Sequence, residues 1–174
     1  MAVKITYFVH GTSIDNENEK LSPLGIKQTK QLREQTKDKI FDVIFSSDLK
    51  RAIDTAKFAF EGRAPIILDK RLRECDYGEH NGKPTSIVEP LQEENIFHRF
   101  PDGESYEDIK IRIVDFLNFL KENYDGKAVA LVAHKGPQLA LDVIIKNKTW
   151  EQAFAEDWRK TKSWQPGWEY ILNT

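Results

Sequence analysis

The stretch Lys4-Ile5-Thr6-Tyr7-Phe8-Val9-His10-Gly11-Thr12 decides the fold that the sequence predicts. It is rich in β-branched and aromatic residues, which favours a strand, and it ends abruptly on a histidine and a glycine. A second run with the same design, Ala128-Val129-Ala130-Leu131-Val132-Ala133-His134-Lys135-Gly136, follows more than a hundred residues later. Parallel strands present their carboxyl ends at one edge of a sheet, so we expect His10 and His134 to lie close together.

Strand and helix patterns alternate along the chain, which is typical of an α/β domain with a mostly parallel sheet. We therefore predict a three-layer α/β/α sandwich, in a single domain over residues 1–174. The predicted strands are 3–9, 41–45, 66–68, 128–133 and 168–172. The predicted helices are 22–37, 49–60, 104–124 and 137–145, with short helices after Pro84 and near Trp150.

Two helices have clear end signals in the sequence. Ser22 followed by Pro23 is an N-cap with proline at the first helical position, and Ser46-Ser47-Asp48 offers caps for the helix that follows. The connection 69–101 contains several glycines and prolines and is less regular. Long connections of this kind often carry function.

Composition excludes several classes of function. The chain has 26 basic and 28 acidic residues, a net charge of −2, which provides no general field for nucleic acid or an anionic membrane. No apolar stretch approaches the ~20 residues of a membrane helix, and the first residues lack a secretory signal pattern. The single cysteine, Cys75, excludes an internal disulfide. We expect a cytoplasmic protein that binds neither nucleic acid nor membrane.

Four residues are candidates for chemistry. His10 and His134 end two strands, Arg51 lies in the first turn of a helix where an anion can bind, and Glu74 precedes a glycine-bearing loop from which it can donate a proton. Each one alone has a plainer interpretation. A histidine at a strand end is often only structural, and a single arginine or glutamate is often only solvated.

The order of these pieces resembles the histidine phosphatase superfamily, also called the phosphoglycerate mutase-like family. The resemblance covers most of the chain, and it rests on several short motifs in the right order rather than on any single one. These are residues 7–12 (YFVHGT), 21–25 (LSPLG), 41–52 (FDVIFSSDLKRA), 72–74 (LRE), 77–79 (YGE), 101–105 (PDGES) and 132–136 (VAHKG).

The resemblance implies a phosphomonoesterase that hydrolyses a small organic phosphate, such as a sugar or nucleotide phosphate. It implies that His10 becomes a phosphohistidine, that Arg51 holds the phosphoryl oxygens, and that His134 stabilises the transferring group. Glu74 would protonate the leaving oxygen and then assist water. Phosphoryl transfer needs this combination of an in-line nucleophile, cations and a proton source. No metal and no cofactor are implied, and a homodimer remains open.

One position departs from the family pattern. Val9 stands where the family has arginine before the nucleophilic histidine. Loss of one oxyanion stabiliser can cost about 2.7–4 kcal/mol, or roughly a hundred- to a thousandfold in rate. Lys135 is an unusual cation beside His134 that could replace part of this charge, although a solvated surface lysine is the plainer interpretation.

The predicted substrate-binding residues are Arg51, Gly11, Thr12, Lys135 and Arg73. His98 and Arg99 are further candidates on the long connection. The segment from Thr12 to Lys20 is short and acidic, whereas relatives often have a longer loop facing the phosphate.

Three competing motifs fail. Residues 78–84 (GEHNGKP) have the wrong spacing for a nucleotide loop and a proline where Ser or Thr should bind magnesium. Cys75 lacks the arginine of a cysteine phosphatase loop, and a small buried residue is its plainer role. The tryptophans near Arg159, Lys160 and Lys162 are better explained as packing around the last strand than as base-stacking residues.

Two other functions stay open beside the phosphatase. One is a catalytically weak or inactive member that binds phosphate in a regulatory role, which Val9 favours. The other is a phosphotransferase of the phosphoglycerate mutase type. The connection from Asp69 to Pro101 leaves little room for the long insertion that such mutases carry over their active site.

Overall fold

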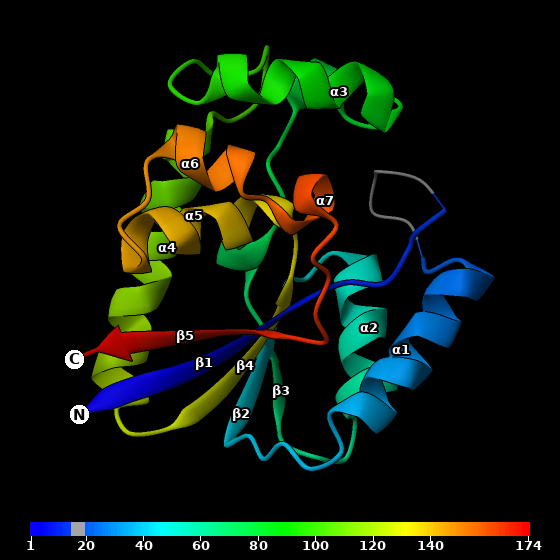
Figure 1. Ribbon diagram of the computed structural model, residues 1–174, viewed down its shortest axis with the longest axis vertical. Helices are drawn as coiled ribbons and strands as arrows, with labels where there is room; N and C mark the ends of the chain where they lie inside the picture. Colours follow the sequence, from blue (N-terminus) through cyan, green and yellow to red (C-terminus); the bar gives the residue numbers. More distant parts are fainter. Residues whose placement is uncertain (15–19) are drawn as a thin grey trace.

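A computed structural model describes residues 1–14 and 20–174, and it contains a mixed, mostly parallel sheet (Figure 1). The strand order is β3-β2-β4-β1-β5. Strand β5 is antiparallel to β1, whereas the other pairs are parallel. The strands are β1 (Ala2–Val9), β2 (Val43–Ser46), β3 (Ile66–Leu68), β4 (Ala128–Ala133) and β5 (Trp168–Asn173). The predicted α/β class is confirmed, and the last strand lies at one edge of the sheet.

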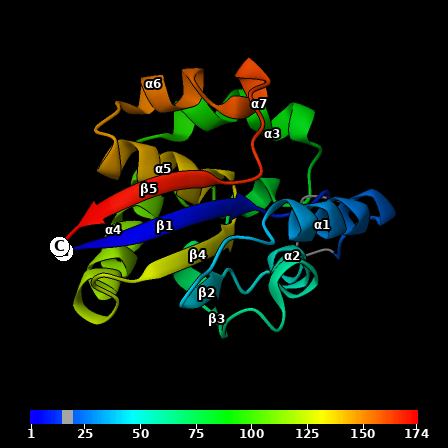
Figure 2. The ribbon, with the colours of Figure 1, turned by 60° about the horizontal axis from the view of Figure 1, so that its bottom comes forward.

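Helices cover both faces of the sheet (Figure 2). Helices α1 and α2 pack on one face and α4 and α5 on the other, while α3 and α7 lie toward the top of the view in Figure 1. The helices are α1 (Pro23–Gln35), α2 (Lys50–Phe60), α3 (Thr85–Gln92), α4 (Tyr106–Asn123), α5 (Lys135–Ile145), α6 (Trp150–Ala155) and α7 (Trp158–Thr161). Three short 3-10 turns span Lys70–Leu72, Gly78–His80 and Glu93–Asn95.

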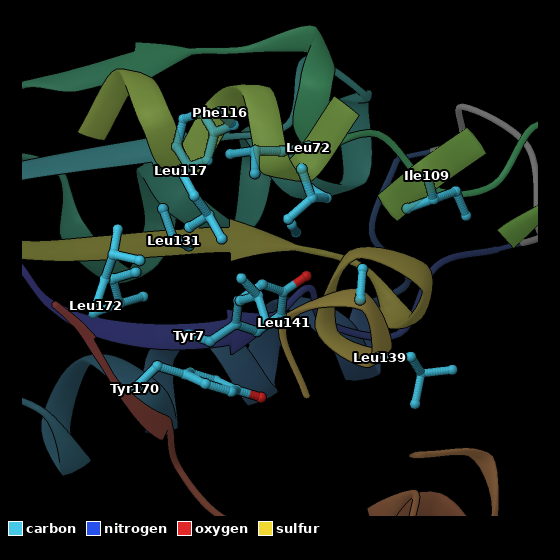
Figure 3. Close-up of a cluster of buried hydrophobic side chains, with 14 of the residues drawn as sticks. Tyr7, Leu72, Ile109, Phe116, Leu117, Leu131, Leu139, Leu141, Tyr170 and Leu172 are labelled. Carbon is cyan, nitrogen blue, oxygen red and sulfur yellow. The ribbon is translucent and has the colours of Figure 1, made fainter. Parts of the chain in front are cut away.

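Successive side chains of β1 point to opposite faces of the sheet, where the core forms two clusters. Tyr7 packs into the cluster under α4 and α5, whereas its neighbour Phe8 packs into the cluster under α1 and α2. Figure 3 shows the first cluster, in which Tyr7 and Leu131 from the sheet lie among Phe116 of α4 and Leu139 of α5. On the side of α4 and α5, Val3, Ile5 and Tyr7 are all buried, whereas on the other side Phe8 is buried and Lys4 is exposed.

Several boundaries differ from the sequence prediction. Helix α5 begins at Lys135 instead of Pro137, because a proline is tolerated within the first turn, where no backbone donor is needed. Helix α2 has Leu49 as its N-cap, without a side-chain cap, and β2 begins at Val43 instead of Phe41. The predicted cap at Ser22 is confirmed, because its hydroxyl accepts a hydrogen bond from the N–H of Gly25. Helix α7 was not predicted.

Strand register brings the two histidines together. Val9 pairs with Ala133 across β1 and β4, and the backbone N–H of His10 donates to the carbonyl of Ala133 at 3.1 Å. Both histidines therefore follow directly from neighbouring parallel strands.

The chain after His10 runs close against the start of α1. A Cβ on Gly11 would lie 2.8 Å from the carbonyl oxygen of Gly25, and a Cβ on Gly25 would lie closer still to Thr12. Only glycine at both positions allows this approach. Residues 15–19, which hold most of the acidic segment noted above, lie outside the described residues. Within the described part, no helix is long and apolar enough to cross a membrane.

Candidate active site

His10 lies half-buried at the end of β1 with its two ring nitrogens in different roles. Nδ1 lies 2.7 Å from the carbonyl oxygen of Gly11, which can only accept, so Nδ1 carries the proton. Nε2 therefore has a lone pair, and it accepts a hydrogen bond from Nε of Arg51 at 3.3 Å. Burial, and then the charge of Arg51, lower the pKa of His10 to about 3. The imidazole is thus neutral and has the tautomer that a nucleophile needs.

Arg51 is in the first turn of α2 and only 5% exposed. A fixed guanidinium beside a nucleophilic nitrogen can bind the oxygens of an incoming phosphoryl group. Thr55, one turn later, links the helix to the loop: its hydroxyl donates to the carbonyl of Arg51 at 2.8 Å and accepts from the N–H of Gly11 at 3.0 Å. The start of α2 and the end of β1 are therefore held as one unit.

His134 is fully buried beside His10, with ring centroids 4.9 Å apart. Its Nε2 shares a hydrogen bond of 2.8 Å with the hydroxyl of Ser47, and Tyr7 binds its backbone through the phenol oxygen. Burial, followed by the proximity of His10, lowers its pKa well below the usual value. Its Nδ1 is buried and has no partner in the described part of the chain.

Glu74 is held in place by two backbone donors. Its Oε1 accepts hydrogen bonds from the N–H groups of Cys75 at 2.8 Å and Gly136 at 2.9 Å. A Cβ at Gly136 would lie 2.5 Å from this oxygen, so the glycine makes the contact possible. The carboxyl group is thereby joined to the start of α5, immediately after His134, and it lines the same cavity as His10.

A cavity of about 820 Å³ opens over these residues. His10, Arg51 and Glu74 line it, and so do Gly11 and Thr12 among the predicted substrate-binding residues. His134 is fully buried and is not part of the lining. Of the four residues that the sequence predicts for one shared site, His10, Arg51 and Glu74 line the cavity. The fourth, His134, is buried and contacts the ring of His10.

Lys135 lines the cavity, but its ammonium already has partners. Nζ donates to Oε1 of Gln92 at 2.9 Å and lies 3.4 Å from Oδ2 of Asp157. The other oxygen of Asp157, Oδ1, accepts from Nη1 of Arg159 at 2.8 Å. We call Gln92, Lys135, Asp157 and Arg159 the roof. They come from α3, the start of α5 and the α7 region, and Gln92, Lys135 and Arg159 line the cavity.

The other predicted cations do not reach the cavity. Arg73 forms a two-pronged ion pair with Asp48, at 2.6 and 2.7 Å, because its side chain leaves the loop on the side of that carboxylate. Arg99 is exposed and binds Asp108, and His98 is exposed as well. None of the three is among the lining residues.

Cys75 is a buried residue without catalytic character. Burial raises the pKa of its thiol far above the usual value, so the reactive thiolate does not form. This agrees with the role that the sequence suggested for it.

Sequence reasoning missed Arg159 as a residue of this site. Its position was visible only as one charge in a region rich in tryptophan, which was interpreted as packing. That interpretation is correct for Trp158, whose ring stacks on Trp168 with centroids 5.4 Å apart. Arg159 lies at the cavity because this stack holds its segment there. No local pattern in the sequence indicates the stack.

Several known proteins similar to this chain are named phosphatases, and others are named probable phosphoglycerate mutases. The chain is 32% identical over 115 residues to "Uncharacterized phosphatase PhoE" of Bacillus subtilis, a match that covers 66% of the chain and 58% of that protein. It is 31% identical over 133 residues to "Phosphoserine phosphatase 1" of Hydrogenobacter thermophilus, covering 70% of the chain and 62% of that protein. The chain thus spans less than two thirds of the length of these relatives.

Among solved structures, Bacillus stearothermophilus YhfR shares the fold with a TM-score of 0.78 at 20% identity, covering 88% of this chain and 85% of that one. The family model for the histidine phosphatase superfamily (branch 1) matches residues 6–166, which include both strand-end histidines and the start of α2. With the sheet, the paired imidazoles and this match in agreement, the chain belongs to branch 1 of the histidine phosphatase superfamily.

Proposed function

We propose that the protein is a phosphomonoesterase that works through a phosphohistidine at His10. The observation that supports this most is the state of the His10 ring, which is neutral with its proton on Nδ1, so that Nε2 offers a lone pair beside the Arg51 guanidinium. A histidine that is neutral well below pH 7 needs no base to activate it.

In the first proposed step, Nε2 of His10 attacks phosphorus while the bond from phosphorus to the ester oxygen breaks. The leaving oxygen takes a proton from Glu74 and departs as an alcohol. Arg51 holds the phosphoryl oxygens as their charge redistributes, and the buried His134 acts through its contact with the His10 ring. The arrangement costs little reorganisation because two backbone N–H groups already hold the Glu74 side chain and the Gly11 carbonyl holds the His10 ring.

In the second proposed step, water attacks the phosphohistidine. Glu74, now a carboxylate, accepts a proton from the water while the bond from phosphorus to nitrogen breaks. Inorganic phosphate leaves, and His10 and Glu74 return to their starting states. Glu74 acts as acid and then as base, which microscopic reversibility requires of a group on the leaving side.

One part of the cavity wall supports a substrate with an uncharged leaving group. Its volume of about 820 Å³ is large enough for a sugar or nucleoside beyond the phosphoryl group. The second half of α1 and the segment 164–168 contribute only uncharged residues to the lining, namely Gln31, Leu32, Gln35, Trp164, Gln165, Pro166 and Trp168. Amides and indoles suit hydroxyl groups and ring faces. We therefore expect sugar or nucleoside monophosphates to exceed phosphoserine and bisphosphates in kcat/KM.

The test is transfer of label to the protein. The chain is incubated with a ³²P-labelled activated phosphomonoester, quenched rapidly, and examined for acid-labile, base-stable label and for release of phosphate. Wild type should form the label and turn over, and His10→Ala should do neither. His98→Ala is the matched control, because His98 is exposed and outside the cavity.

Absence of both turnover and His10-dependent label over a broad panel of monoesters would contradict the proposal. Val9 favours the alternative, a phosphate-binding domain without efficient turnover. That alternative predicts saturable binding of inorganic phosphate with no label at His10.

A further inference from the structure

The cavity around His10 has an incomplete set of cations at its base. During transfer, a phosphoryl group spreads negative charge over three oxygens and is stabilised by more than one fixed cation. Arg51 is one such cation, but Val9, which lines the cavity just before His10, brings no charge. His10 itself is neutral. A second cation must come from another part of the lining.

Two further cations, Lys135 and Arg159, line the described part of the cavity. Lys135 is 11% exposed, and its ammonium is directed into the roof, where it contacts Gln92 and Asp157 and lies 5.7 Å from the Phe154 ring. These contacts use up to two of the three ammonium donors and direct the ammonium away from His10, so at most one donor is left for a phosphoryl oxygen. Lys135 is therefore poorly placed to serve as the second cation.

Arg159 differs from Lys135 in how much of its donor capacity is used. Nη1 donates to Asp157, while no acceptor among residues 1–14 and 20–174 is recorded for its Nε and Nη2. The side chain is 27% exposed, and its guanidinium lies 4.4 Å from the Trp158 ring centre. Since guanidinium groups have five donors in a planar fork, Arg159 can bind Asp157 and an anion together.

The Trp158 ring gives Arg159 a rigid support. It stacks on Trp168 of β5, and its Nε1 donates to Gln138 of α5 at 3.2 Å. Asp157, which is 1% exposed, anchors the same segment by accepting from the backbone N–H and the side chain of Arg159. The guanidinium is thus fixed at the cavity before a ligand arrives, which reduces the entropy lost on binding.

We propose that Arg159 is the second phosphoryl-binding cation, in place of the arginine that family members have before the nucleophilic histidine. The inference rests on the proposed function in one respect, that the phosphoryl group lies at His10. The electrostatic effect of Arg159 agrees with this position, because its charge contributes to lowering the pKa of both His10 and His134. Because the charge of Arg159 acts on both imidazoles, it also acts on a phosphoryl group bound between them and the roof.

The test measures binding of inorganic phosphate by calorimetry at pH 7 and turnover of p-nitrophenyl phosphate. Arg159→Gln should weaken phosphate binding ten- to a hundredfold and lower kcat/KM by a similar factor, and Arg159→Lys should recover part of each. Lys160→Gln is the matched control. It lies in the same helix, pairs with Glu93 at 3.5 Å and lines a different cavity, so it should change either quantity less than twofold.

The double variant Val9→Arg with Arg159→Gln separates charge from structure. Because Val9 lines the same cavity, an arginine there should restore phosphate affinity to within a few-fold of wild type. Phosphate affinity within twofold of wild type in Arg159→Gln overturns the inference. So does a loss in Arg159→Gln that accompanies a fall in the unfolding midpoint and is not restored by Val9→Arg.

The two proposals fail in different ways. Phosphate binding that depends on Arg159 without any label at His10 would contradict the proposed function and support the placement of Arg159. Label at His10 and turnover that are unchanged in Arg159→Gln would support the proposed function and contradict the placement of Arg159.

Discussion

The base of the site and its roof are built on different principles. The base consists of His10, Arg51, Glu74 and His134. His10 and His134 follow strand ends and bind the Gly11 carbonyl and the Ser47 hydroxyl, Arg51 lies in the first turn of α2, and Glu74 lies in a loop where two backbone N–H groups hold it. The roof is held by ion pairs and side-chain contacts between α3, the start of α5 and the α7 region. Catalysis requires reacting groups that are held rigidly, as in the base. The ion pairs of the roof instead allow charge to be shared between separate segments of the chain.

Val9 leaves Arg51 as the cation of the base, and Lys135 and Arg159 of the roof are the further cations that line the described part of the cavity. We therefore expect substitutions in the base to lower turnover most, and those in the roof to lower it less, in proportion to the charge they remove.

The largest effect is expected from Arg51→Gln in the base. The variant keeps hydrogen-bonding capacity but loses the charge next to Nε2 of His10, so kcat/KM for p-nitrophenyl phosphate should fall about a hundred- to a thousandfold. Arg73→Gln is the control, because Arg73 pairs with Asp48 outside the cavity, and it should retain wild-type turnover. Equal losses in the two variants would remove the distinction between cavity and surface cations.

A smaller loss is expected from Gly136→Ala. The added methyl group would lie 2.5 Å from Oε1 of Glu74 and should displace the carboxylate, lowering kcat/KM roughly ten- to a hundredfold. Because the proposed role of Glu74 is to protonate the leaving group, the loss should be greater for an alkyl phosphate than for p-nitrophenyl phosphate. An equal loss for both substrates would show that Glu74 is not the proton donor.

In the roof, Lys135→Met should have a modest effect on turnover. Lys135 already pairs with Asp157, so its removal should lower kcat/KM less than fivefold, clearly less than Arg159→Gln. It leaves the buried Asp157 with one cationic partner, and the free energy of unfolding in urea should fall by roughly 1–3 kcal/mol. A hundredfold loss of turnover with unchanged stability would make Lys135 the phosphate-binding cation instead.

The smallest effect concerns pH and stability. The pKa of His10 is lowered to about 3 and that of His134 is also lowered, so between these values and the ordinary 6.5 the unfolded chain binds more protons than the folded one. Their contribution to stability is therefore complete above pH 7 and is lost as pH falls, by at most ~1.4 kcal/mol per pH unit for each histidine.

Urea unfolding at pH 7, 6 and 5 measures this slope, and His10→Ala should reduce it. A slope that is unchanged in His10→Ala would mean that the ring is not held neutral by the fold.

The local sequence determined most of the base. Apolar β-branched runs specify β1 and β4, a Ser-Pro pair starts α1, and the period of α4 predicts its buried face, in which Ile109, Phe116 and Leu120 are all buried. Because parallel strands end at a common edge, His10 and His134 were predicted to meet from sequence alone. Arg51 and Glu74 were placed by their motifs and by the family resemblance.

Only the tertiary structure decided how the charges are distributed. Arg73 and Lys135 were candidates by position, but Asp48 binds one and Asp157 binds the other. Arg159 reaches the cavity through the stack of Trp158 on Trp168. Strands and helices follow short-range periodicity, which a sequence displays directly, whereas the partner of a long charged side chain depends on which distant segment packs beside it.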